Sequence, residues 1–168
     1  MGVSHKVVKN DFPKVVKELK VASGSAVEVG VLKGGHAWLA GIHEYGCTIT
    51  VTPKMRAWLH YQGVHLKKET TQIVIPERSF LRTGYDQNRA EVLSHASKLL
   101  ADVAAGTMSA DQMLKGVGLE LSSAIRDYAL ELSSPANSGM TTGRKGSSNP
   151  LVDTGDMIGG IDYRVVSK

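Results

Sequence analysis

The chain has 168 residues, of which 42% are hydrophobic, so a single domain over residues 1–168 with one sizeable core is expected. Its one cysteine, Cys47, excludes an intramolecular disulfide, a CxxC pair and a four-cysteine zinc site. The first residues lack the apolar core of a signal peptide, and no run of about 18 apolar residues is present that would cross a bilayer. We therefore expect a soluble protein, made inside the cell and without membrane contact.

The net charge of +4 is unevenly distributed. Residues 53–82 hold six basic and two acidic side chains, an excess that equals the charge of the whole chain. A basic patch can contact phosphate groups. Here, however, the basic residues alternate with apolar ones, as on the solvent-facing side of a sheet. The pattern favours a solvated face or a protein contact over direct nucleic-acid binding.

The first part of the chain predicts short elements in alternation. Residues 5–20 carry apolar side chains near helical spacing with lysines between them, which predicts an amphipathic helix. Residues 26–32 alternate valine with polar residues and glycine, which predicts a half-buried strand. Residues 37–45 predict a short helix that ends at Gly46, and residues 48–52 predict the next strand, which the following proline closes.

The centre of the chain joins a short strand to a long helix. Residues 54–66 suit either a short helix or an irregular strand, so their state is left open. Residues 72–75 are apolar and β-branched, and Pro76 cannot donate to a ladder, which predicts a strand that stops there. A helix over residues 79–105 follows, with Ser79 as its N-cap and one apolar face.

A second long helix begins at a capping box, Ser109 with Gln112 three residues later. Gly116 and Gly118 lower its helix propensity by about 1 kcal/mol each relative to alanine. We therefore expect a close backbone contact on that turn. Its apolar stripe consists of Leu114, Val117, Leu121, Ala124, Ile125, Tyr128 and Leu132.

The last part of the chain predicts a loop and a returning strand. Residues 134–150 are rich in glycine, serine and proline, which predicts a long flexible arm that becomes ordered against a neighbouring subunit. Residues 161–166 alternate again and predict a final strand. The expected fold is α+β: a small, mainly antiparallel sheet flanked by two long helices and one or two shorter ones, with the arm attached.

Residues 151–155 have the form of an aspartic-protease triplet, in which apolar residues precede Asp-Thr-Gly. In that fold two such loops meet, so that two carboxylates share a proton. The triplet lies early in those chains, whereas only 15 residues follow Asp153 here. A turn in which Asp153 or Thr154 caps a short helical turn is the favoured interpretation.

Other chemically active side chains form no recognisable site. His43 and Glu44 are sequence neighbours that point to different faces of a helix, and no HExxH pattern follows. Residues 143–147 match a phosphate loop only in their letters. Cys47 follows a helix-ending glycine and is expected to be a small buried hydrophobe. The remaining histidines considered as ligands, each isolated in sequence, are His36, His60 and His65. We expect no catalytic, cofactor-binding or metal-binding residues, and therefore no enzyme.

Four motifs in one order resemble a known family. They are His-Glu-Tyr-Gly at residues 43–46, Ile-Pro-Glu-Arg-Ser-Phe-Leu-Arg at residues 75–82, the Lys-Gly-Ser-Ser-Asn-Pro-Leu-Val-Asp-Thr-Gly-Asp-Met segment at residues 145–157, and the strand at residues 161–165. Together they look like the neck and tail-completion proteins of tailed bacteriophages, the minor-tail and virion-morphogenesis group. The resemblance spans roughly residues 26–166.

The resemblance implies a structural virion protein that is assembled in the host cytoplasm and located in the tail or neck. Such proteins form homo-oligomeric rings, here expected to be a hexamer, that let the tail join the head. Implied partners are other neck or connector proteins and tail-tube proteins, with DNA in the central channel. Two alternatives stay open, a tail terminator that caps tube growth and a DNA-binding accessory protein.

The sheet-to-helix corner and the basic residues around it are the expected contact regions. Phe80 and Leu81 are expected in the core, whereas Arg78 and Arg82 are expected to be exposed to a neighbour's acidic groups or to DNA phosphate. The full set of interface candidates is Lys54, Arg56, Arg78, Arg82, Arg144 and Lys145.

Overall fold

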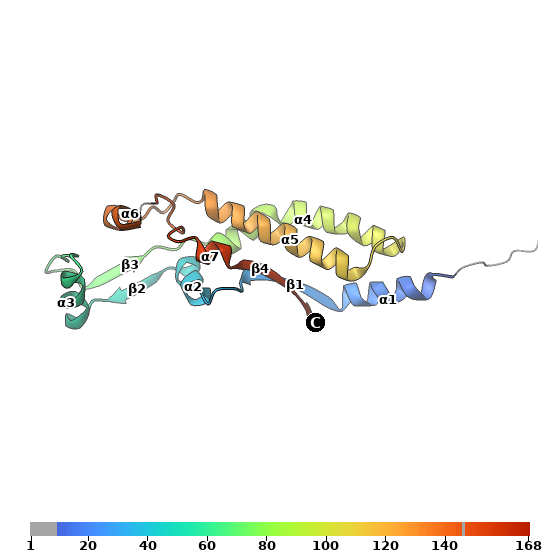
Figure 1. The fold of residues 1–168 in the computed structure, drawn as a ribbon, viewed down its shortest axis with the longest axis horizontal. Coiled ribbons are helices and arrows are strands. Elements are labelled where there is room, and N and C mark those ends of the chain that lie inside the picture. The colour runs from blue at the N-terminus through green and yellow to red at the C-terminus, as the bar shows by residue number, and fades with distance from the viewer. Residues whose placement is uncertain (1–9, 146) are drawn as a thin grey trace, which may run out of the picture.

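A computed structural model describes residues 10–145 and 147–168 of the chain. Two long helices, α4 (Phe80–Ala104) and α5 (Ala110–Glu131), pack against each other along most of their length and form the body of an elongated molecule (Figure 1). The capping box predicted at the start of α5 is present, because the Ser109 and Gln112 side chains each accept from the other's backbone N–H. The expected α+β fold is confirmed.

The strands form two separate antiparallel ribbons. β1 (Ser25–Val31) pairs with β4 (Ile161–Ser167) and packs against α5. β2 (Cys47–Thr50) pairs with β3 (Gln72–Ile75) and points away from the body. The sequence predicted the strands but suggested one sheet. Among the described residues no strand joins the two ribbons, because α2 (Ala37–Tyr45) redirects the chain between β1 and β2 (Figure 1).

The shorter helices differ from expectation at their boundaries. α1 (Phe12–Ser23) begins later and ends later than predicted, with Pro13 in its first turn, and residues 1–9 lie outside the described part. α2 ends at Gly46 as predicted, where φ is +71° and an added Cβ would lie 2.9 Å from the Glu77 nitrogen. Only glycine fits both this conformation and this contact.

The two regions that composition described least well also contain helices. The region left open, residues 54–66, contains most of a short helix, α3 (Pro53–Tyr61). The Met55 N–H donates to the Thr52 side chain at the start of this helix. Residues 134–150, expected to be structureless, contain α6 (Gly139–Lys145). A short helix, α7 (Asp156–Gly159), follows the Asp-Thr-Gly turn. Its N-cap position is Gly155 in a left-handed conformation, while the hydroxyl of Thr154, one of the two predicted caps, accepts from the Asp156 N–H at 3.4 Å.

The main core lies where α4, α5, α7 and the β1–β4 ribbon meet. Phe80 is fully buried there and Leu81 packs against the cluster, so the prediction that both belong to the core is confirmed. Gly118 lies under the ring of Tyr163, and an added Cβ would come within 2.3 Å of the Tyr163 Cδ2 atom. The close contact expected at this turn is therefore real at Gly118, although its partner is an aromatic ring from β4 rather than backbone.

Candidate functional site at the base of a projection

Residues 47–75 form a separate projection at one end of the molecule. It consists of the β2–β3 ribbon with α3 at its far end (Figure 1). A two-stranded ribbon is marginally stable in water unless other groups support it. Some support comes from Arg56, whose guanidinium donates to the backbone carbonyls of Leu66, Lys67 and Thr70. Arg56, an interface candidate, therefore stabilises the loop between α3 and β3 within the projection itself.

The far end of the projection exposes large aromatic side chains. Trp58 is 59% exposed and Tyr61 is 85% exposed, both on α3. Three exposed lysines lie in the same part of the chain, Lys54 on α3 and Lys67 and Lys68 in the loop after it. Aromatic rings of this size are normally buried in a core or a contact surface. The projection thus carries a basic and aromatic surface that the described part of the chain leaves uncovered.

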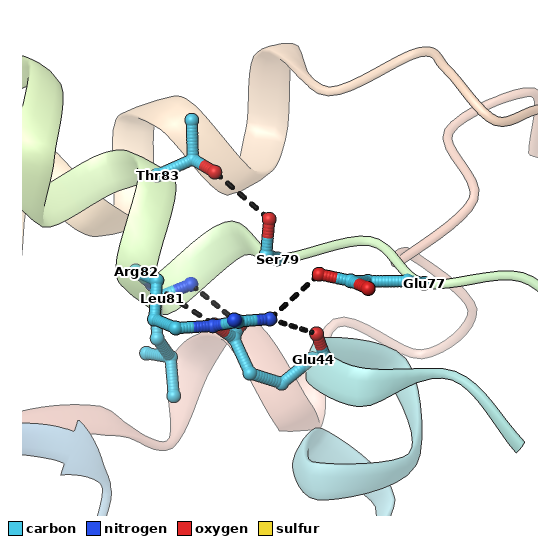
Figure 2. A network of polar contacts seen from close by, with 6 residues as sticks. All are labelled: Glu44, Glu77, Ser79, Leu81, Arg82 and Thr83. Carbon is cyan, nitrogen blue, oxygen red and sulfur yellow. Dashed lines mark hydrogen bonds and ion pairs between the residues drawn. The ribbon is translucent and has the colours of Figure 1, made fainter.

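Glu44 joins the base of the projection to the body (Figure 2). Its side chain is 3% exposed, and its carboxylate accepts from the Leu81 N–H at 2.8 Å and the Arg82 N–H at 3.0 Å. It therefore caps the N-terminus of α4, where a negative charge is favourable. Ser79, the expected cap, occupies the N-cap position but has its hydroxyl paired with the Thr83 hydroxyl instead.

The guanidinium of Arg82 closes this network. Its Nε donates to the Glu44 carboxylate at 2.9 Å, and its Nη2 donates to the Glu44 carbonyl and to the Glu77 carboxylate (Figure 2). The hydrogen bond with Glu44 raises the pKa of Arg82, which stays charged. The guanidinium also stacks over the Tyr45 ring at 4.8 Å. Arg82 is half exposed, as expected, but its Nε and Nη2 atoms donate within the chain.

Arg78 is buried, contrary to expectation. It is 4% exposed, and its guanidinium donates to the carbonyls of Pro135 and Ala136 and to the side chain of Asn137. Its backbone N–H donates to the His43 carbonyl at 2.7 Å. Burial lowers the pKa of Arg78, and the surrounding carbonyls compensate for the lost hydration. Arg78 therefore fixes the start of residues 134–150 to the body instead of contacting a neighbour.

His43 is held neutral beside Arg78. Burial, followed by the positive charges of Arg78 and Lys145, lowers the pKa of His43. Its Nδ1 lies 3.5 Å from the Arg78 Nη1 atom. Because a guanidinium only donates, Nδ1 must accept and the ring proton must be on Nε2.

The Asp-Thr-Gly turn and the end of α6 meet α2 around an open depression of about 500 Å³. His36 and His43 line it from one side, and Lys145 and Asp153 from the other. Thr154 donates to the Asp156 carboxylate at 2.7 Å, which closes the turn within itself. The triplet is a structural turn before α7, and Asp153 faces a lysine rather than a second aspartate.

The interface candidates do not form one patch. Arg78 and Arg82 lie together at the base of the projection, whereas Lys54 and Arg56 lie near its far end. Lys145 donates to the Pro150 carbonyl, and the side chain of Arg144 lies outside the described part.

Sequence reasoning missed the capping role of Glu44, since the helix it caps begins 36 residues later in the chain. Its place in the His-Glu-Tyr-Gly motif at residues 43–46 was the sequence feature that could have pointed to Glu44.

Two histidines described as isolated are in contact. The Nδ1 atoms of His60 and His65 lie 2.7 Å apart on the projection, so one ring donates to the other. Within the described residues no three His, Cys, Asp or Glu side chains are placed to hold a metal ion.

Comparison with known protein families, with curated proteins and with solved structures finds no match to this chain. None of its described helices is both long and apolar enough to span a membrane.

Proposed function

We propose that this chain is a structural virion protein of a tailed bacteriophage, part of a homo-oligomeric ring at the head-to-tail neck or at the completed end of the tail. Its neighbours in the particle are further copies of itself, other neck or connector proteins and tail-tube proteins. The observation that carries the proposal is the projection, an extended ribbon that ends in exposed aromatic and basic side chains. The sequence resemblance to neck and tail-completion proteins supports it.

The projection has the properties of an assembly element. β2 and β3 pair only with each other among the described residues, so each leaves one backbone edge open. Tryptophan and tyrosine are the residue types that contribute most to protein interfaces. The base is fixed by the buried Glu44 and Arg78 networks, so the projection has a defined direction. A rigid, uncovered element of this kind suits contact with another subunit.

A DNA-binding accessory role draws on the same surface. Aromatic rings beside lysines can stack on bases and contact phosphate groups. The two roles differ in their response to salt. DNA binding would be favoured by an affinity for duplex or single-stranded DNA that falls steeply as the salt concentration rises. This affinity should be lost when Lys67 and Lys68 are replaced by alanine. The structural role predicts no such affinity for the isolated chain.

Electron microscopy of lysates from the phage lacking this gene tests the proposal. Filled heads beside separate tails are expected for a neck or completion protein. Tails of irregular, excessive length would assign the chain to termination of tube growth instead. Normal infectious particles would contradict a structural role in the virion.

A further inference from the structure

The charges of the projection and of the long helices are opposite. Residues 47–75 hold four basic and one acidic side chain, a net charge of +3. Residues 80–131 hold five basic and seven acidic side chains, a net charge of −2. The two regions lie at different ends of the molecule, and α3 makes no extensive contact with α4 or α5 in the described chain (Figure 1). A contact between them therefore requires two copies of the chain.

A groove runs between α4 and α5. One stretch of about 370 Å³ is lined by the acidic side chains of Glu91, Glu120 and Asp127. The adjoining stretch of about 640 Å³ is lined by the apolar side chains of Leu99, Met108 and Leu119, the last 62% exposed, together with polar side chains. It shares Glu120, whose carboxylate is already paired with His95 at 2.7 Å. The groove thus offers carboxylates beside an uncovered apolar floor.

Gly116 shapes the apolar stretch of this groove. An added Cβ at Gly116 would have only the Leu99 Cδ1 atom nearby, at 3.6 Å, which is ordinary van der Waals contact. The neighbouring Gly118 is required by the Tyr163 ring, but no contact with the described residues requires Gly116. A glycine that costs helix propensity and is exposed keeps this stretch open.

We propose that the α3 end of the projection, with Trp58 and Tyr61, docks into the α4–α5 groove of a second copy of this chain. The aromatic rings cover the apolar floor around Leu119, and the nearby lysines face the carboxylates of Glu91 and Asp127. The two surfaces are different patches of one chain, so the contact is heterologous and repeats from copy to copy into a ring or a filament. This inference rests on the proposed function and names the contact that would build its ring.

Two variants test the two surfaces of this contact one at a time. Trp58→Ala with Tyr61→Ala removes the docking side chains, both of which are already exposed in the single chain. Gly116→Leu places a large side chain in the groove and keeps α5 intact, since leucine has the higher helix propensity and its Cβ would meet only the Leu99 Cδ1 atom, at ordinary contact distance. Trp38→Ala is the matched control, because Trp38 is 70% exposed but lies on α2, outside both surfaces.

Sedimentation velocity over a range of concentrations measures the outcome. Wild-type chain and Trp38→Ala are expected to associate in a concentration-dependent way, more weakly at high salt. Each of the other variants is expected to be monomeric with unchanged circular dichroism. Their mixture should form a one-to-one dimer and nothing larger, because the Gly116→Leu chain supplies an intact projection and the other chain supplies an open groove.

The inference would be overturned by a wild-type chain that stays monomeric up to its solubility limit, by variants that associate like wild type, or by a mixture that stays monomeric. Equal loss of association in Trp38→Ala would also overturn it, since the contact would then involve another face. Failure here is distinguishable from failure of the proposed function. Separated heads and tails in the deletion phage would keep the virion role even if this contact were absent.

Discussion

The charged residues at the base of the projection stabilise the join between two parts of the chain rather than a binding surface. Glu44 is nearly fully buried, yet its carboxylate has three donors from the first turn of α4 and from Arg82. A buried carboxylate is tolerated only when it is paired in this way. Arg78 is satisfied in the same manner by backbone carbonyls. These residues fix where the projection leaves the body.

Replacing Glu44 by alanine tests this role. The change leaves the first N–H groups of α4 without their cap and Arg82 without its main partner, so we expect the free energy of unfolding to fall by about 3 kcal/mol. Glu77→Ala is the control, because Glu77 is 54% exposed and bonds only to the same guanidinium; its loss should cost less than about 1 kcal/mol. Urea unfolding measures both. Equal losses would refute the capping role.

His43 gives the stability a specific pH dependence. Above its ordinary pKa of 6.5 the imidazole is neutral in both states and contributes nothing. Below that pH the unfolded chain takes up the proton first, because the folded pKa is lowered. The free energy of unfolding therefore falls as the pH decreases from about 6.5 and levels off below the lowered pKa.

The substitution His43→Asn isolates this effect. Its amide oxygen can still accept from Arg78, but it does not titrate in this range. We expect urea unfolding between about pH 7 and about pH 5 to show a smaller loss of stability on acidification than in the unmodified chain. Identical pH profiles for the two chains would contradict the assignment.

At the scale of the elements, the two glycines of α5 have opposite roles. Gly118→Ala places a methyl group against the Tyr163 ring, so the ring must move and we expect a net loss of about 2 kcal/mol. Gly116→Ala adds a Cβ at ordinary contact distance from Leu99 and should gain about 1 kcal/mol from helix propensity. Thermal unfolding of the two variants measures both changes in stability. A gain in stability in Gly118→Ala as well would show that the β4 contact does not constrain α5.

Local patterns predicted most of these elements. β-branched alternation located β1 and β4, the capping box located the start of α5, and Gly46 located the end of α2. Pairing was harder, because the strands of the first ribbon are joined by almost the whole chain, with Val31 opposite Ile161. The burial of Arg78 was missed for the same reason, since its partners lie 57 residues or more further along and are mainly backbone carbonyls that carry no sequence signal.

At the scale of the whole molecule, the candidate site was predictable only as a set of motifs. Three of the four segments that carry the phage resemblance, residues 43–46, 75–82 and 145–157, meet around the base of the projection and the neighbouring depression, through contacts that include Glu44, Arg78 and Lys145. The fourth, residues 161–165, pairs with β1 instead. The basic residues were expected to form the contact surface. Most of them instead hold the chain together, and the aromatic side chains of α3 remain as the uncovered surface. Composition could not separate these roles, since both kinds of residue occur in the same 30-residue stretch.

We predict that the proposed virion role depends on the aromatic end of the projection, Trp58 and Tyr61 on α3. Complementation of the gene-deleted phage with the Trp58→Ala, Tyr61→Ala chain tests this most directly, with Trp38→Ala as control. We expect wild type and Trp38→Ala to restore joined, infectious particles, and the double variant to leave filled heads and separate tails in electron micrographs. Normal particles formed by the double variant would contradict the central claim.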